Sequence, residues 1–260
     1  MKIACLAKYC VDPANLVCDK ATGRYDFERS PRKINEVDQN AVEEAVKIKT
    51  TTDCVVHIFS VGPTEAAKPM RELLGMGADR AFLISDPEVR NADSHAIADL
   101  LKRAIQKQGP YDLILAGYAS EDSYAGSVAL MLAEMLHMPH VAYASKISID
   151  GQALTAVREV DGKVETIESK LPALITVTRE LNTPRYVSAL QTLRVPRDAL
   201  TTLRLSDLGE TPEEYARTCR AEILELMTVP THRKNILLDG ADTATAVIKL
   251  LDALRDDGVL

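Results

Sequence analysis

The stretch from residue 117 to residue 128, G-Y-A-S-E-D-S-Y-A-G-S-V, combines hydroxyl-bearing, acidic and small residues in a way that suits a phosphate group. It runs straight into an apolar, helix-forming segment at residues 125–136. Backbone N–H groups at the start of a helix attract an anion, so the stretch predicts a phosphate cradle. An ordinary helix cap, with Asp122 or Ser123 as the N-cap residue, is the alternative. The stretch matches neither G-x-G-x-x-G nor Walker A, so the residues alone indicate only a nucleotide-binding α/β protein.

Catalytic side chains are not evident elsewhere in the sequence. His57 falls in a predicted strand, His95 in a predicted helix, and His137 and His140 flank Pro139. None has a Cys, Ser or carboxylate partner at a spacing typical of a catalytic pair, and there is no H-E-x-x-H or G-x-S-x-G motif. We therefore expect structural histidines, no catalytic residue and no metal site. A protein of this kind leaves chemistry to a cofactor.

Composition narrows the class of protein. The 260 residues carry a net charge of −7 and have no basic stripe interleaved with aromatic residues, which argues against a nucleic-acid partner. No window approaches eighteen uninterrupted apolar residues, and the N-terminus lacks the pattern of a signal peptide, so no membrane insertion is expected. Five scattered cysteines without a C-x-x-C pair indicate reduced thiols and a cytoplasmic location.

The elements that must position the loop alternate between short apolar runs and amphipathic segments. Strands are predicted at residues 3–7, 55–60, 81–84, 113–116 and 174–178, and helices at 38–49, 64–74, 94–107 and 125–136. Strands that are apolar throughout, separated by helices, indicate a parallel sheet covered on both faces. Asp150-Gly151 and Asp161-Gly162 join alternating segments at 144–149, 153–160 and 163–170, which predicts an antiparallel hairpin extension.

The character of the chain changes after Asn182. Residues 183–195 show no clear period, and residues 203–230 hold a short helical pattern at 211–226 but too little apolar surface for a core. Residues 241–255 form an amphipathic helix whose apolar face must be buried, either on a partner chain or on the chain's own domain. We therefore divide the chain into an α/β domain with its hairpin extension, residues 1–182, and an arm, residues 183–260.

The predicted sheet also locates the site. Open parallel sheets bind ligands at the carboxyl ends of their strands, near a switch point. Ala7 and Lys8 come at the end of the first strand, Val61 and Gly62 follow the second, and the stretch at 117–128 follows the fourth. These segments are expected to meet at one edge of the sheet.

Several motifs together resemble those of one family. They are M-K-I-x-x-x-x-K at the start, Ile34-Asn35 before N-A-V-E-E-A-V-K-I-K, V-G-P at 61–63, G-M-G-A-D-R-A at 75–81, D-L-I-L-A-G at 112–117 and L-N-T-P-R-Y at 181–186. Residues 156–176 are in register with the family signature at Arg158, Asp161, Gly162, Glu165, Ile167, Pro172, Leu174, Ile175 and Thr176, while Lys163 departs from it. Over nearly its whole length the chain resembles the β subunits of electron-transfer flavoproteins.

The resemblance implies a Rossmann-like fold of the adenine-nucleotide α-hydrolase type and a heterodimer with an α subunit that carries FAD. The β subunit of this family holds AMP in simple carriers and a second FAD in NADH-using, electron-bifurcating members. By resemblance, the residues that line the adenosine half are Leu6, Ala7, Asn35, Asp38, Val61 and Gly62, and those that hold phosphate are Asp122, Ser123, Gly126, Ser127 and Val128. Ala125 and Ser127 replace the Thr and Gln of many relatives.

The resemblance also implies a docking segment that follows Arg185. In relatives, a Leu-Pro loop and a Lys run after this point dock a flavin dehydrogenase, such as an acyl-CoA dehydrogenase, or a quinone-linked oxidoreductase. Here Ala189 is in register with the Leu and Leu190 with the Pro, and the Lys run is absent. Arg185, Ala189 and Leu190 are the predicted partner contacts, and the partner is expected to differ from a standard dehydrogenase. Residues 183–260 would form this docking segment and an arm on the α subunit.

Two features resemble the bifurcating members of the family in particular. They are A-D-S-H-A-I-A at residues 92–98 and the C-terminal arm with D-G-A-D-T-A-T-A-V-I-K-L-L. They favour FAD over AMP in this subunit and electron transfer from NADH, with flavin reduction only in the α/β complex. The alternative is a nucleotide-binding signalling protein of the universal-stress type, which shares the α/β core but not the signature at 156–176.

Overall fold

The computed structural model describes residues 1–19, 22, 24–89, 92–221 and 234–260. The chain divides into two compact units, Met1–Leu226 and Met227–Leu260. The end of the predicted helix at 211–226 lies partly outside the described residues.

The first unit is built on one twisted sheet. Nine strands of the described residues lie in the order β11-β10-β9-β12-β8-β1-β6-β7-β13. Their bounds are β1 (Lys2–Leu6), β6 (Val55–Val61), β7 (Arg80–Ile84), β8 (Leu113–Gly117), β9 (His140–Asp150), β10 (Ala153–Val160), β11 (Lys163–Lys170), β12 (Ala173–Val177) and β13 (Leu200–Leu203). In this spatial order, each neighbouring pair from β9 through β12, β8, β1, β6 and β7 to β13 is parallel. Strands β10 and β11 extend the β9 edge as antiparallel hairpins. The predicted α/β fold, parallel sheet and hairpin extension are confirmed.

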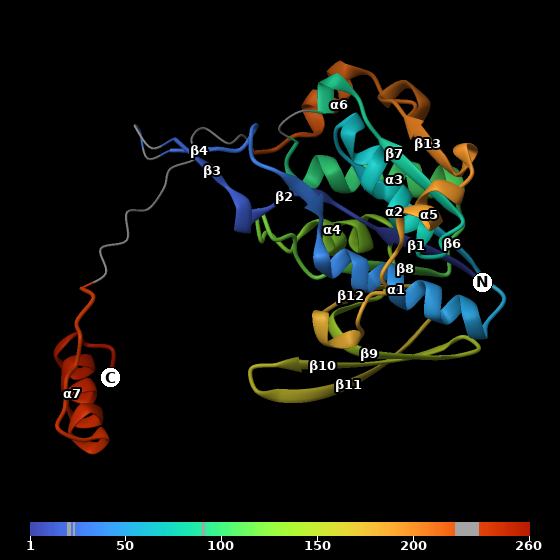
Figure 1. Cartoon of the computed structure of the whole chain (residues 1–260). Coiled ribbons are helices and arrows are strands. Elements are labelled where there is room, and N and C mark those ends of the chain that lie inside the picture. The colour runs from blue at the N-terminus through green and yellow to red at the C-terminus, as the bar shows by residue number, and fades with distance from the viewer. Residues whose placement is uncertain (20–21, 23, 90–91, 222–233) are drawn as a thin grey trace. The chain divides into compact units, whose positions relative to one another are not determined.

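Helices cover both faces of the sheet (Figure 1). Helices α1 (Glu36–Thr51) and α2 (Ala67–Gly75) pack in one core cluster, and α3 (Ser94–Gln108) and α4 (Val128–Met135) pack in the other. Alternate residues of a strand point to opposite faces, so Ile3 and Cys5 of β1 join the first cluster while Ala4 and Leu6 join the second. Because both faces are buried, the central strands are largely apolar, and His57, Ser60 and Thr176 are their buried polar residues.

Helix α4 begins three residues later than predicted. Its N-cap is Ser127, so neither Asp122 nor Ser123 caps it. Tyr124 has φ +52° and Gly126 has φ +60°, both in the left-handed region, which a right-handed helix excludes. The stretch before Ser127 is therefore a loop at the carboxyl end of β8.

Residues after Asn182 contribute more to the first unit than their composition suggests. Helix α5 (Ala189–Arg194) lies against α2, and β13 pairs in parallel with β7. The side chains of Leu203, Leu205, Leu208 and Tyr215 are buried in the second core cluster, the last from α6 (Pro212–Thr218). These side chains form no core of their own; β13 continues the sheet, and they join the second core cluster over α3. The division of roles at residue 182 stays a prediction.

A segment of short strands separates β1 from α1. Strand β2 (Tyr9–Val11) pairs with β5 (Arg32–Ile34), and β3 (Val17–Cys18) pairs with β4 (Tyr25–Asp26), both antiparallel. The sequence pattern did not predict them. The β2–β5 ribbon returns the chain to the end of β1, where α1 begins.

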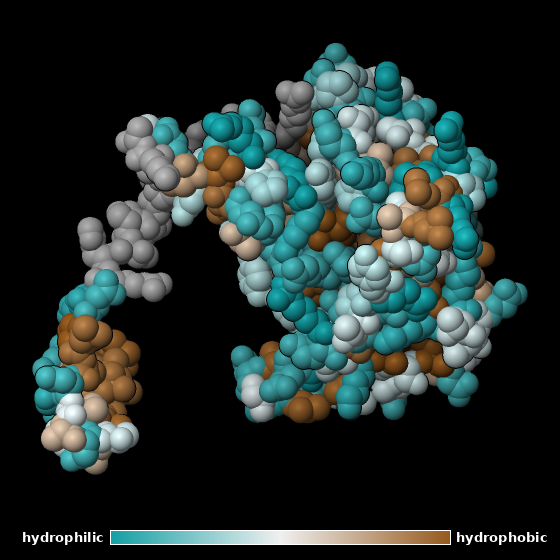
Figure 2. Space-filling view, viewed as in Figure 1, coloured by the Kyte–Doolittle hydropathy of each residue, from teal (hydrophilic) through white to brown (hydrophobic). Residues whose placement is uncertain are grey.

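The second unit holds one described helix, α7 (Thr243–Asp256), within residues 234–260. Asp242 caps it by accepting a hydrogen bond from the backbone N–H of Thr245 at 2.8 Å. The helix buries none of its residues, and Figure 2 shows apolar atoms gathered on one side of this unit. No helix in the described part of the chain combines the length and apolar character that crossing a bilayer requires.

Candidate nucleotide-binding site

The carboxyl ends of three neighbouring strands form the candidate site. The chain passes from β1 through β6 to β7 on one side, then returns to place β8 on the other side of β1. This reversal is the switch point of the sheet. Ala7 donates its N–H to the carbonyl of Phe59 in β6 at 2.9 Å, and Gly62 donates to the carbonyl of Ile84 in β7 at 3.0 Å. The strand ends predicted to line the site therefore lie side by side.

Asp38, in the first turn of α1, joins the two strands that flank the switch point. One carboxylate oxygen accepts the N–H of Lys8 at 2.8 Å, and the other accepts the N–H of Gly117 at 2.9 Å. Burial raises the pKa of Asp38 to about 6, although both backbone donors and the side chain of Asn35 favour the charged form. The carboxylate is thus a brace between the ends of β1 and β8.

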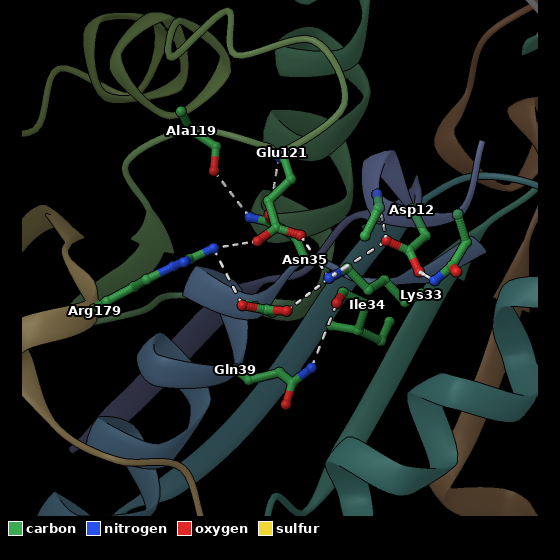
Figure 3. Close-up of polar contacts among 11 residues, drawn as sticks. Asp12, Lys33, Ile34, Asn35, Gln39, Ala119, Glu121 and Arg179 are labelled. Carbon is green, nitrogen blue, oxygen red and sulfur yellow. Dashed lines mark hydrogen bonds and ion pairs between the residues drawn. The ribbon is translucent and has the colours of Figure 1, made fainter. Parts of the chain in front are cut away.

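Asn35, directly before α1, makes a second brace. Its side-chain amide donates to the carbonyl of Ala119 at 2.9 Å, and its side-chain oxygen accepts the N–H of Glu121 at 3.1 Å (Figure 3). Its own backbone N–H bonds to the carbonyl of Lys8 at 2.9 Å. Both predicted polar residues of the adenosine half are therefore buried and hold the loops in place.

Gly117 is required where these elements meet. A Cβ atom at this position would lie 2.4 Å from Oδ1 of Asp38 and 3.1 Å from its backbone N. Any side chain would displace the first turn of α1 from the end of β8. The glycine therefore permits the close approach that lets Asp38 bridge the two strands.

Lys8 brings a positive charge into the site and was not among the predicted cofactor-binding residues. Its ammonium donates to Oδ1 of Asp122 at 2.6 Å and to Oγ of Ser120 at 3.1 Å. Although burial raises the pKa of Asp122, the Lys8 ammonium and the N–H of Ser123 hold it below its usual value. Asp122 and Ser120 thus hold Lys8 beside the loop, and Ser123 bonds to both of them.

The end of the loop presents the start of α4. Ser127 is the N-cap residue but makes no side-chain capping hydrogen bond, and Val128 is the first helical residue. Gly126 turns the chain into the helix at φ +60°. The first N–H groups of a helix lack partners within it, so the start of α4 can receive an anion.

Charged side chains form a network around this edge of the sheet (Figure 3). Lys33 Nζ lies 2.9 Å from Glu121 Oε2 and 2.6 Å from Glu36 Oε1. Arg179, which follows β12, pairs with the same two carboxylates, 3.1 Å from Glu36 Oε2. The network ties the β2–β5 ribbon, the start of α1, the loop after β8 and the end of β12 to one another. Apart from Lys33 with Glu36, these pairs join residues far apart in the sequence and have no local signal by which they could be predicted.

Arg185, one of the predicted partner contacts, is held by the domain itself. Its guanidinium forms a two-pronged ion pair with the buried Glu43 of α1, at 2.8 Å and 2.9 Å. It also donates to the carbonyl of Met76 at 3.3 Å. The side chain thus fastens the segment before α5 to α1, and any contact with a partner stays a prediction.

Ala189 and Leu190 lie at the start of α5 with their side chains exposed. Tyr186, Leu190 and Leu193 are all exposed large apolar side chains, with Leu190 57% exposed. Figure 2 shows an apolar patch over the position that α5 occupies in Figure 1. Arg71 holds the end of this helix by donating to the carbonyls of Val195 and Pro196 at 2.5 Å and 3.3 Å. The predicted docking segment therefore presents apolar surface on a fixed support.

Fold and strand-end geometry define an α/β protein of the Rossmann-like class. Residues 22–202 match the sequence model of the family described as the electron transfer flavoprotein domain. The electron transfer flavoprotein subunit beta of Thermoanaerobacterium thermosaccharolyticum is 38% identical over 188 residues, 72% of each chain. That of Bacillus subtilis is 34% identical over 233 residues, 88% of this chain and 90% of the relative. The caffeyl-CoA reductase-Etf complex subunit CarD of Acetobacterium woodii is 35% identical over 214 residues, 82% of each chain.

The chain therefore belongs to the β-subunit family of electron-transfer flavoproteins. The resemblance noted from the motifs is confirmed, and membership decides against the universal-stress alternative. It makes the chain an electron-transfer flavoprotein subunit.

Proposed function

We propose that this chain holds an adenine nucleotide at the carboxyl edge of its sheet and works beside an α subunit that carries FAD. The observation that carries the proposal is the convergence of the ends of β1, β6 and β8 at the switch point, fixed there by Asp38 and Asn35. Sheets of this class bind ligands at this place. Family membership supports the nucleotide and the α subunit as partner.

The residues present fit a phosphate group. The start of α4 has no side-chain cap, and Gly126, directly before the N-cap residue, carries no side chain. Lys8 supplies a cation in the same loop cluster. Ser127 and Val128 would receive phosphate through their backbone N–H groups, while Asp122 and Ser123 would act by holding Lys8 and the loop. Leu6, Ala7, Val61 and Gly62 would line the adenosine, with Asn35 and Asp38 fixing the walls around it.

FAD is the nucleotide we favour over AMP. The A-D-S-H-A-I-A segment and the C-terminal arm resemble those of NADH-using members, and the small residues at 125–127 leave room for a longer ligand. The relative named for a caffeyl-CoA reductase complex is a subunit of an assembly with a reductase. By analogy, this chain would help pass electrons between NADH, a flavin dehydrogenase or a quinone-linked oxidoreductase on one side and a redox partner on the other. A bound flavin would supply the redox chemistry, and the chain would supply binding and orientation.

Nucleotide analysis of the co-purified two-subunit complex tests this proposal. We expect two FAD per heterodimer and direct reduction by NADH, followed in the visible spectrum. One FAD and one AMP without a response to NADH would keep the adenine-nucleotide site but overturn FAD and bifurcation. A complex in which the β subunit holds no nucleotide would overturn the proposed function itself.

A further inference from the structure

Three tyrosine rings meet beside the candidate phosphate loop. Tyr118 follows β8, Tyr124 lies in the loop before α4, and Tyr143 belongs to β9. The ring of Tyr118 lies 5.8 Å from that of Tyr124, nearly perpendicular, and 5.2 Å from that of Tyr143, tilted by 36°. The hydroxyls of Tyr118 and Tyr124 share a hydrogen bond of 2.9 Å. We call these three residues the tyrosine cluster.

Strand register places the cluster at the same edge of the sheet as the candidate site. Val177 of β12 is level with Gly117 of β8, and also with Ala144 of β9. Tyr143 therefore lies level with the end of β8, two strands further along the sheet. Tyr124 is two residues from Gly126, a span of at most about 7 Å. The phosphate loop after β8 contributes Tyr118 and Tyr124. The strand ends of the adenosine half, β1 and β6, lie on one side of β8, and Tyr143 in β9 lies on the other.

The cluster is exposed and its backbone is strained. Tyr124 is 67% exposed and Tyr143 is 43% exposed. Both lie in the left-handed region, at φ +52° and φ +64°, which bulky residues seldom occupy. Residues that the surrounding fold holds in strained backbone conformations are concentrated at ligand-binding and other functional sites. Packing does not explain the exposed rings, since two of the three leave much of their surface in water.

We infer that the tyrosine cluster is the stacking site for the isoalloxazine ring of an FAD whose phosphates lie at the start of α4. The inference rests on the proposed function and extends it to the residues that select the ligand. Large aromatic rings stack face to face with an offset or edge to face, and an exposed cluster offers both geometries. AMP ends at its phosphate and has no second ring system that could stack on the cluster. The three tyrosines would therefore favour FAD over AMP without contacting the adenosine that both ligands share.

A competition experiment on the two-subunit complex tests this role. Complex freed of its β-subunit nucleotide is equilibrated with equal concentrations of FAD and AMP, filtered and denatured, and the released nucleotides are counted after subtracting the FAD that the α subunit retained before the incubation. We expect the wild-type β site to take FAD, and the double variant Tyr124→Ala/Tyr143→Ala to lower the FAD-to-AMP ratio about tenfold. The matching Phe/Phe variant should keep the wild-type ratio, because stacking needs the rings and not the hydroxyls.

Control variants separate this role from a structural one. Tyr25→Ala removes a ring of 44% exposure in β4, outside the cluster, and should change nothing. Tyr124→Ala alone removes the most exposed ring of the cluster and should shift the ratio in the same direction with the least risk to the fold. An unchanged ratio in the double Ala variant would overturn the inference. Loss of subunit assembly in the double Ala variant, with assembly retained in Tyr25→Ala, would also overturn the inference, because the rings would then contact the α subunit.

The wild-type result distinguishes failure of the flavin-stacking inference from failure of the proposed adenine-nucleotide site. A wild-type β site that takes AMP as readily as FAD would overturn the tyrosine cluster as a flavin site and leave the adenine-nucleotide site standing. A wild-type β site that takes neither nucleotide would overturn the proposed function as well.

Discussion

At the scale of one residue, a substitution of Gly126 tests the proposed phosphate site. In Gly126→Glu, a carboxylate would enter the space before α4, repel a phosphate and compete with it for the helix N-terminus. We expect the complex to lose its β-subunit nucleotide and keep its fold. Gly126→Ala is the matched control, because both variants share the φ +60° strain and the contact of a Cβ 3.3 Å from the Tyr118 carbonyl. Full nucleotide content in the Glu variant, measured after denaturation, would show that the cradle lies elsewhere.

His57 makes the folded chain sensitive to acid. Its Nδ1 lies 2.7 Å from the hydroxyl of buried Tyr111, and burial lowers its pKa from 6.5 to about 4. The unfolded chain takes up this proton below about pH 6.5 and the folded chain only below about pH 4, so the free energy of unfolding falls as pH drops through that window, by up to roughly 3 kcal/mol. Asp38 acts in the opposite sense, since its raised pKa stabilises the fold as pH falls below about 6.

The variant His57→Phe/Tyr111→Phe isolates this contribution. It removes the titrating group and leaves no unpaired hydroxyl, while Asp38 stays in both proteins. Urea unfolding between pH 7 and pH 4.5 should show a smaller loss of stability in the variant than in the wild type. Parallel pH dependences in the two proteins would mean that His57 does not titrate in this way.

Single residues also show what a sequence can reveal about a site. The strand ends and the loop at 117–128 were predictable, because buried parallel strands have a distinctive apolar pattern and their carboxyl ends must meet. The partner of Arg185 was not, since Glu43 is 142 positions away and a charged residue in a helix is ordinarily solvated. The contacts of Lys8 with the loop after β8 and the meeting of the three tyrosine rings could not be predicted for the same reason. They depend on which segments the fold brings together.

At the scale of elements, the periodic segments were predicted well and the irregular ones were not. The strands and helices from β1 to β12 lie within a few residues of their predicted positions, except for the insertion between β1 and α1 and the late start of α4. Strand β13 has four residues and only one buried side chain, Leu203, so no local period marks it. Its pairing with β7 across more than a hundred residues, rather than its own sequence, makes it a strand.

Helix α5 is the element whose exposed surface predicts a docking function. Leu190→Ala should slow electron transfer to the cognate dehydrogenase at sub-saturating partner by tenfold or more, because truncating a central apolar contact often costs about 2 kcal/mol or more. Reduction of the flavin within the complex should not change. Val55→Ala is the matched control, as it removes apolar surface of 43% exposure from β6, outside α5. Equal transfer rates for wild type and Leu190→Ala would remove α5 from the docking surface.

At the scale of the whole molecule, the two units differ in what stabilises them. The unit Met1–Leu226 has two core clusters around its sheet. The described part of the unit Met227–Leu260 consists of α7 and short flanking segments joined by ion pairs, Lys249 with Asp239 and Lys234 with Asp257. Exposed ion pairs contribute little to stability, and α7 buries none of its residues, so the described part of this unit has no core of its own. Its apolar face requires cover from another surface.

The apolar face of α7 predicts that the chain depends on its α subunit. Ala246, Val247, Leu250, Leu251 and Leu254 follow a helical period along one side, and none of them is buried. We expect the full chain alone to aggregate or melt at a lower temperature, and the α subunit to raise that temperature by covering this face. Leu250→Glu places a charge on the face and should abolish the increase, whereas Asp256→Ala, on the opposite side of the helix, should keep it. Light scattering and thermal melting with and without the α subunit measure both effects. A soluble single chain whose melting temperature the α subunit leaves unchanged would show that α7 is covered by the chain's own first unit instead.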